Sequence, residues 1–251
     1  MIEETVRAPD ARLARIIGEL CGVAYTASVT PSLIPPHWTV SIVARASRGA
    51  TPTLWVQGPS PRIRPFVRGE LAWAAGVELR VASAREMLGV PLAALGALSV
   101  PLDDVWPRAR VARLADGLAA ASTMSARLAA LHAALEAHAT EARVVAASAS
   151  AATIAAAVAA LDRDDASVAS VASGLGLSTR QMLRLFRDRV GVSPKECAAL
   201  LRLTRALALL DTQDLAQVAV TAGYYDQAHM NLEFRSRLGM SPGAWRARAA
   251  A

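Results

Sequence analysis

Basic side chains are concentrated in one stretch of this sequence, residues 176–210. The chain has 27 lysine and arginine residues against 21 aspartate and glutamate residues, and Lys195 is its only lysine. In the stretch, the seven basic residues are Arg180, Arg184, Arg187, Arg189, Lys195, Arg202 and Arg205, and the two acidic residues are Asp188 and Glu196. This leaves a local charge of +5 out of a formal net charge of +6. A guanidinium group makes forked contacts with phosphate and base edges. A local excess of arginine therefore favours phosphate contact over a merely solvated face, on which the signs usually mix.

Residue patterns for catalysis or metal binding are missing from the sequence. There is no phosphate-binding P-loop, no nucleophile elbow and no zinc-protease helix motif. The four histidines, His37, His132, His138 and His229, are scattered without metal-ligand spacing, and Cys21 and Cys197 lie far apart. We therefore predict no catalytic residue, no metal site and no cofactor, and we interpret both cysteines as small buried residues.

An internal repeat must position the arginines. Residues 168–194 match residues 215–242 over nearly their whole length, with an offset of 47 at Gly176 and Gly223 and of 48 from Met182 and Met230 onward. One residue is therefore inserted near the start of the second helix of the second copy. Each copy predicts a short helix, a glycine turn and a longer helix, which is the layout of a helix-turn-helix unit.

The longer helix of the first copy is amphipathic. Met182, Leu185 and Phe186 form an apolar stripe that we expect to be buried, and the arginines of this helix fall largely away from it. Residues 194–210 predict one helix of about 25 Å at ~1.5 Å per residue between the copies. Such a spacer would let the two longer helices reach successive major-groove faces of one duplex.

Two sequences carry a resemblance to a known family. They are LSTRQMLRLFRDRVGVSP in the first copy and AGYYDQAHMNLEFRSRLGMSPGAW in the second. Together with the connecting helix, they resemble the DNA-binding domain of the AraC/XylS family of bacterial transcription regulators, over residues 149–248. The resemblance implies sequence-specific binding of double-stranded DNA through two helix-turn-helix units.

The resemblance also implies which residues face the DNA. The base-reading residues would be Arg180, Leu183 and Arg184 in the first copy and Gln227, Ala228 and Asn231 in the second. Arginine forks onto guanine, whereas glutamine and asparagine pair with adenine. The family usually has an arginine at the position of Leu232, so the second helix would bind weakly or read methyl groups and shape. We assign Arg187, Arg189, Arg235 and Arg237 to phosphate contacts, with solvated surface as the alternative.

The first 140 residues predict a mixed domain of strands and helices. Candidate strands are 38–46, 52–57, 63–67 and 77–81, and candidate helices are 108–121 and 124–138. The segment 76–106 is similar to the sensing domain of AraC-like regulators from actinobacteria, which implies effector sensing or self-association. The helices around 114–118 and 128–135 are candidate dimer surfaces, with plain core packing as the alternative.

The predicted fold class is α+β. A mixed α/β sensing or dimerisation domain over residues 1–140 is followed by a linker, 141–150, and by an all-α double helix-turn-helix domain, 151–251. The helices expected in that domain are 151–161, 168–174, 179–189, 194–210, 215–222, 226–237 and 242–248. Ser178, Ser193 and Ser241 occupy positions typical of helix N-caps.

Location and partners follow from the same arguments. The amino terminus carries acids and arginines, and the uncharged run 144–161 is mostly Ala, Ser and Thr, so we expect no membrane span and a cytoplasmic protein. Expected partners besides DNA are a small-molecule effector, RNA polymerase and a second copy of the chain. One rival interpretation is a protein-interaction module or co-regulator with weak DNA binding. Another is an enzyme with a DNA-targeting tail, although residues 1–140 offer no reactive group for it.

Overall fold

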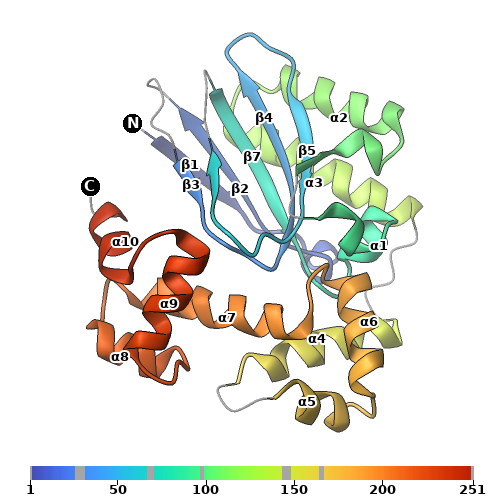
Figure 1. Cartoon of the computed structure of the whole chain (residues 1–251). Helices are drawn as coiled ribbons and strands as arrows, with labels where there is room; N and C mark the ends of the chain where they lie inside the picture. Colours follow the sequence, from blue (N-terminus) through green and yellow to red (C-terminus); the bar gives the residue numbers. More distant parts are fainter. Residues whose placement is uncertain are drawn as a thin grey trace.

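The computed structural model describes residues 2–25, 32–66, 71–96, 99–142, 148–163 and 167–249. In this part of the chain, an antiparallel sheet with helices on one side is followed by a helical half that lies across one end of the sheet (Figure 1). The predicted α+β fold class is confirmed.

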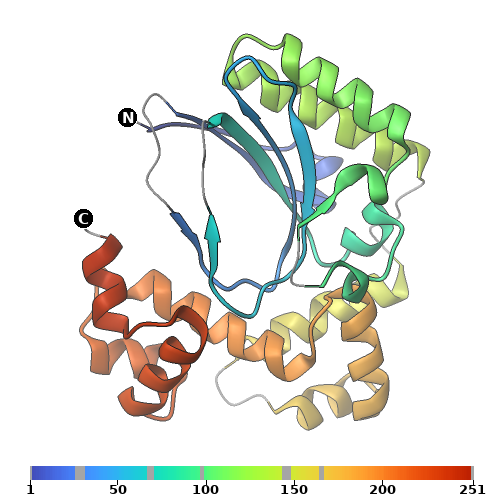
Figure 2. The ribbon, with the colours of Figure 1, turned by 45° about the horizontal axis from the view of Figure 1, so that its top comes forward.

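The main sheet is antiparallel and has the strand order β1-β2-β7-β4-β5-β8. Its strands are β1 (Ile2–Arg7), β2 (Ile17–Tyr25), β4 (Val40–Ser47), β5 (Thr53–Gln57), β7 (Leu71–Leu79) and β8 (Ser99–Pro101). A separate two-stranded ribbon pairs β3 (Ser32–Ile34) with β6 (Arg64–Phe66). In both views this ribbon extends from the sheet toward the last helices of the chain (Figure 2).

One face of the sheet is buried under helices. Along β4, buried and half-buried residues alternate, as expected for a strand with one covered face. Helices α2 (Arg108–Ala120) and α3 (Met124–Glu141) form the cover, and α3 packs on β1, β2 and β7. Gly22 of β2 lies so close to Met124 that an added Cβ would overlap its side chain.

Short elements lie between strands of the sheet and before helix α2. They are the 3-10 turns η1 (Leu13–Arg15), η2 (Leu92–Leu95) and η3 (Leu102–Asp104) and the helix α1 (Ala84–Leu88). Trp106 stacks on His138 with ring centroids 3.9 Å apart, and burial lowers the pKa of that histidine. Trp106 belongs to one apolar core that spans the sheet, α1, α2 and α3.

The helical half contains two smaller cores. Its helices are α4 (Ala149–Leu161), α5 (Val168–Gly174), α6 (Thr179–Arg189), α7 (Pro194–Leu209), α8 (Leu215–Thr221), α9 (Gln227–Leu238) and α10 (Pro242–Ala249). The first half of α7 packs with α4, α5 and α6, and its second half packs with α8 and α9. The long helix α7 thus joins two compact units (Figure 1).

Several predictions need correction. The sequence patterns missed strands β1, β2, β3 and β8, and the predicted strand 77–81 is the last part of β7, which ends at Leu79. Helix α4 begins at Ala149, inside the stretch 141–150 predicted as a linker, of which 143–147 lie outside the described residues. The leucines of α2 and α3 proposed as dimer surfaces, Leu114, Leu118, Leu128, Leu131 and Leu135, are all buried in the core, so core packing is confirmed for them. Among the described residues, no helix has the length and apolar character needed to cross a membrane.

Candidate nucleic-acid interface

The two repeats fold into the same backbone arrangement. Gly176 and Gly223 both adopt a positive φ, +68° and +84°, a conformation that glycine reaches without strain. The residue after each glycine donates its backbone N–H to an alanine carbonyl in the preceding helix, Leu177 to Ala172 and Tyr224 to Ala219, both at 2.9 Å. The structure therefore confirms the helix-turn-helix layout predicted for both copies.

The same bonds locate the inserted residue. Leu177 and Tyr224 occupy equivalent positions, whereas the caps of the following helices are Ser178 and Asp226. The extra residue is therefore Tyr225, at the start of the second unit's longer helix as predicted. Its side chain is 92% exposed.

Helix α6 is the longer helix of the first unit. A reciprocal capping box begins it: the Ser178 hydroxyl accepts from the Gln181 backbone N–H at 3.2 Å, and the Gln181 side chain accepts from Ser178 N–H at 2.8 Å. Met182 and Phe186 are fully buried, while Leu185 is only half-buried. Arg180, Arg184 and Arg187 are exposed on the same helix, and the predicted base-facing residue Leu183 is half-buried beside them.

Helix α9 is its counterpart in the second unit. Asp226 caps it by accepting from the His229 backbone N–H at 2.7 Å. Met230 and Phe234 fill the core positions that Met182 and Phe186 fill in α6. The predicted base-facing residues Gln227 and Ala228 are exposed and Asn231 is half-buried.

The two longer helices differ in the chemistry of their outer faces. Of the described residues, four large apolar side chains are exposed, and three of them belong to the second unit: Val220 (71%), Tyr225 (92%) and Leu232 (67%). Leu232 lies where α6 has Arg184. The first unit thus presents a cation at a position where the second presents an apolar group.

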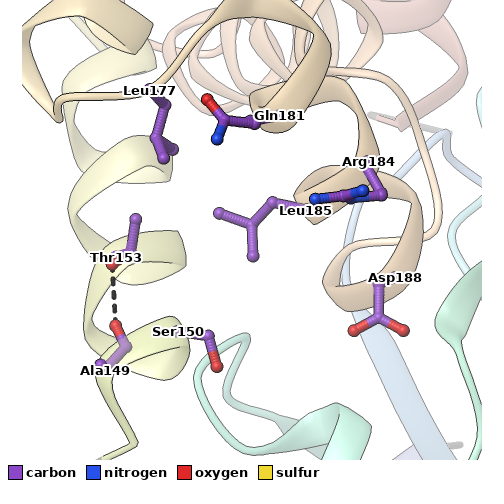
Figure 3. Close-up of a pocket in the computed structure, with 8 residues that line it drawn as sticks. All are labelled: Ala149, Ser150, Thr153, Leu177, Gln181, Arg184, Leu185 and Asp188. Atoms are coloured by element: carbon purple, nitrogen blue, oxygen red, sulfur yellow. Dashed lines mark hydrogen bonds between the residues drawn. The ribbon is translucent and has the colours of Figure 1, made fainter.

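A groove of about 560 Å³ runs along one side of α6 (Figure 3). Its lining residues are Ala149, Ser150 and Thr153 of α4, Leu177 of the turn, and Gln181, Arg184, Leu185 and Asp188 of α6. Leu185 projects across the groove toward α4 (Figure 3). Within the described part of the chain, Arg184 makes no hydrogen bond or ion pair, so its guanidinium group is available to a ligand.

Several cations of the basic stretch are paired inside the protein. Arg189 is only 8% exposed and lies 2.8 Å from Glu86. Arg202 and Arg205 face Glu233 at 3.7 Å and Asp162 at 3.4 Å. The local charge of +5 therefore overstates the positive surface, because these three cations pair with carboxylates of the protein itself.

Arg237 is also engaged within the protein. Its guanidinium donates to Glu196 at 2.6 Å, to Glu233 at 2.8 Å and to the Pro61 carbonyl at 2.9 Å. Burial by itself lowers the pKa of Arg237, but the bonds to the two carboxylates outweigh it and raise that pKa. The geometry therefore does not fit the phosphate contacts predicted for Arg189 and Arg237, whereas Arg187 and Arg235 are exposed.

The amino-terminal half contacts both units directly. Arg85 Nε of α1 lies 3.0 Å from Asp188 of α6, next to the Glu86 and Arg189 pair. At the second unit, the Ile63 N–H donates to the Arg237 carbonyl at 2.8 Å. No sequence signal marks Arg85, Glu86 or Ile63, because their partners lie more than a hundred residues away along the chain.

Comparisons with known proteins agree with this geometry. A protein-family model described as a helix-turn-helix domain matches residues 171–248, which include both units. The carboxy-terminal region is an AraC-type helix-turn-helix domain. The family expectation drawn from the two repeats is confirmed for this region.

Two curated relatives match about a third of this chain. The HTH-type transcriptional regulator MtrA of Neisseria gonorrhoeae is 29% identical over 85 residues, which are 33% of this chain and 28% of that protein. The uncharacterized HTH-type transcriptional regulator YidL of Escherichia coli K12 is 35% identical over 80 residues, which are 31% of this chain and 27% of that protein. The chain thus spans little more than a quarter of the length of these relatives.

A solved structure with a similar domain is the DNA-binding domain of AdpA, a global transcriptional factor, in complex with a target DNA. The match has 30% identity and a TM-score of 0.36 and covers 41% of this chain and 93% of that one.

Proposed function

We propose that this protein is a sequence-specific DNA-binding transcription regulator that reads two adjacent major-groove segments of double-stranded DNA. The observation that carries the proposal is the pair of helix-turn-helix units. Each has the same backbone hydrogen bond in its turn, and one helix joins the two units. Helix α7 has 16 residues, about 24 Å at ~1.5 Å per residue. A spacer of this length suits successive major-groove faces, roughly one turn apart.

In this proposal the first unit reads bases through α6. Arg180 and Arg184 are exposed, and a forked guanidinium matches the two acceptors of guanine. Leu183 lies between them and would contact the methyl group of thymine. The exposed Arg187 would bind phosphate and fix the register of the helix.

The second unit would read bases through α9. Gln227 and Asn231 would pair with adenine edges, and Ala228 would allow close approach to the groove. Arg235 is exposed and would bind phosphate. Leu232 offers no hydrogen bond, so this unit would contribute methyl contact and shape recognition where the first contributes a charged pair.

The amino-terminal half would regulate this platform. The domain limits that we propose are 1–140, 141–150 and 151–251, and helix α4 begins at Ala149. A groove of about 330 Å³ on the uncovered face of the sheet includes Glu19, Ser41, Gln57 and Glu78, polar groups suited to a small-molecule effector. We further propose action in the cytoplasm, as a homodimer that contacts RNA polymerase.

The exposed apolar side chains of the second unit favour a second candidate function. If Val220, Tyr225 and Leu232 bind another protein, the chain is a co-regulator with weak DNA affinity. This alternative predicts poor discrimination between specific and random duplex, because only α6 would read bases.

Selection of genomic fragments by the purified full-length protein, at two salt concentrations, tests the proposal. A regulator should enrich a bipartite motif with half-sites about one turn apart, and the enrichment should survive the higher salt because base contacts depend less on counterion release than phosphate contacts do. A single half-site would reduce α9 to a positioning element. If no motif is enriched, either by the purified protein alone or after cell extract is added as a source of effector, the proposal is overturned.

A further inference from the structure

Three side chains with metal-ligating groups converge where the segment before η1 meets helix α3. Asp10 precedes η1, and His132 and Glu136 lie one turn apart on α3. One ligand atom from each of the three lies within 4.8 Å of the other two. The site joins residues 122 positions apart, which explains why the sequence showed no metal-ligand spacing.

The separation between Asp10 and His132 suits two ligands of a shared ion. Asp10 Oδ2 lies 3.6 Å from His132 Nε2, which is too long for a hydrogen bond. Two ligands bound tetrahedrally at about 2.0–2.2 Å lie roughly 3.4 Å apart. The observed distance is therefore close to the edge of a tetrahedral metal site.

The histidine is oriented for coordination. Its residue is 8% exposed, and Nε2 accepts a long bond of 3.3 Å from the Asp10 backbone N–H. With the ring proton on Nδ1, the lone pair of Nε2 that accepts this long bond is the one that a metal binds, so a bound ion would replace the amide bond. The buried imidazole thus points its basic nitrogen at the loop that carries the carboxylate.

The first carboxylate is also held in place. Asp10 Oδ1 accepts backbone N–H groups from Leu13 at 2.9 Å and Arg12 at 3.0 Å, which fixes the plane of the carboxylate. The bond from Leu13 is the main reason that the pKa of Asp10 lies below its usual value. The other oxygen, Oδ2, is the atom directed toward His132.

The second carboxylate is weakly committed to another partner. Glu136 Oε1 lies 3.9 Å from Arg12, in a pair whose side chains are 60% and 40% exposed. Such an exposed, long ion pair contributes little to stability, on the order of 0–1 kcal/mol. Glu136 can therefore turn to a metal ion at small cost.

We propose that Asp10, His132 and Glu136 form a binding site for a first-row divalent transition metal such as Zn²⁺. One imidazole nitrogen and two carboxylate oxygens supply three ligands, and the exposed side of the site leaves a fourth position to water. Mg²⁺ and Ca²⁺ prefer all-oxygen sites, so the imidazole disfavours them. The bound ion would tie the segment before η1 to helix α3.

Metal binding is tested with untagged full-length protein carrying Cys21→Ser. This substitution removes a thiol that lies 3.1 Å from Glu4 and would compete for zinc. Zn²⁺ is titrated calorimetrically into chelator-treated protein, and Co²⁺ serves as a spectroscopic probe of tetrahedral geometry. We expect one Zn²⁺ per chain, a higher melting temperature with Zn²⁺, and no response to Mg²⁺.

Two near-isosteric variants test the ligands without deleting a buried side chain. Asp10→Asn keeps an oxygen for the Leu13 amide, and Glu136→Gln alters a half-buried residue. Each should weaken zinc binding by about tenfold or more and reduce the thermal shift. Asp116→Asn, an exposed carboxylate on α2, should bind zinc like the parent. Absence of stoichiometric binding at micromolar zinc, or equal affinity in all variants, would overturn the proposal.

Discussion

Arg85 and Asp188 lie 103 residues apart in the sequence, yet the Arg85 guanidinium is 3.0 Å from the Asp188 carboxylate. The next residue on each helix forms a second ion pair, Glu86 with Arg189 at 2.8 Å, in which the acid lies on α1 and the base on α6. Both pairs engage the last turn of α6, whose first two turns expose Arg180 and Arg184. The amino-terminal domain therefore contacts the proposed base-reading helix itself, which gives it a direct route to influence DNA binding.

Reversing the charge of either residue should weaken this contact, and reversing both charges should restore it. Arg85→Asp and Asp188→Arg each place like charges together, and the double variant re-forms the pair with opposite polarity. Because both side chains are about one-third exposed, we expect a coupling free energy of only about 0.2–1 kcal/mol. Amide hydrogen exchange in α1 and α6 measures it. Purely additive effects of the two single variants would show that the pair does not couple the domains.

Two glycines at equivalent positions of the repeat separate backbone strain from domain contact. Gly191 and Gly239 follow α6 and α9 with φ of +88° and +71°. An added Cβ at Gly239 meets nothing within 4 Å, whereas at Gly191 it would lie 2.9 Å from the Leu92 carbonyl oxygen and 3.0 Å from Pro59.

Both alanine variants should therefore pay for a left-handed residue, about 1–2 kcal/mol, but only Gly191→Ala should also disturb the domain contact. Denaturant unfolding gives the two stability losses, and hydrogen exchange at η2 reports the contact. Equal losses, with η2 unchanged in both variants, would argue against tight docking of the two halves.

Arg184→Ala should weaken specific DNA binding by about 1–3 kcal/mol and relax base preference at one position of the site. The physical reason is that its guanidinium is exposed and has no partner among the described residues. Binding to the selected site and to single-base variants of it gives both quantities. Arg113→Ala, an exposed arginine on α2, is the matched control and should have no effect. Unchanged affinity and base preference in Arg184→Ala would remove Arg184 from the base-reading set.

Leu232→Arg should raise non-specific DNA affinity and steepen its dependence on salt, by about one counterion per added phosphate contact. The side chain is 67% exposed on α9, so the substitution should leave the fold intact. Ala112→Arg adds the same charge on α2, away from the two units. If both variants show the same salt slope, position 232 does not face the DNA.

The sequence determined the helical half almost completely. Helices α5 and α6 have the predicted limits, because serine caps and positive-φ glycines fix where short helices begin and end. The repeat also fixed the position of the insertion, since each copy forms its turn with local backbone bonds. These signals act over a few residues and are therefore readable along the chain.

Tertiary structure decided what the charged and metal-ligating side chains do. Arg184 and Arg189 look alike in the sequence, but only the docking of α1 shows that Arg189 is buried against Glu86 while Arg184 is exposed. Likewise, Asp10 meets His132 only because the segment before η1 packs on α3. Strands such as β1 and β2 also escaped prediction, because strand pairing joins residues that are distant in sequence. Packing between residues that are distant in sequence decides these partners, so local sequence patterns do not predict them.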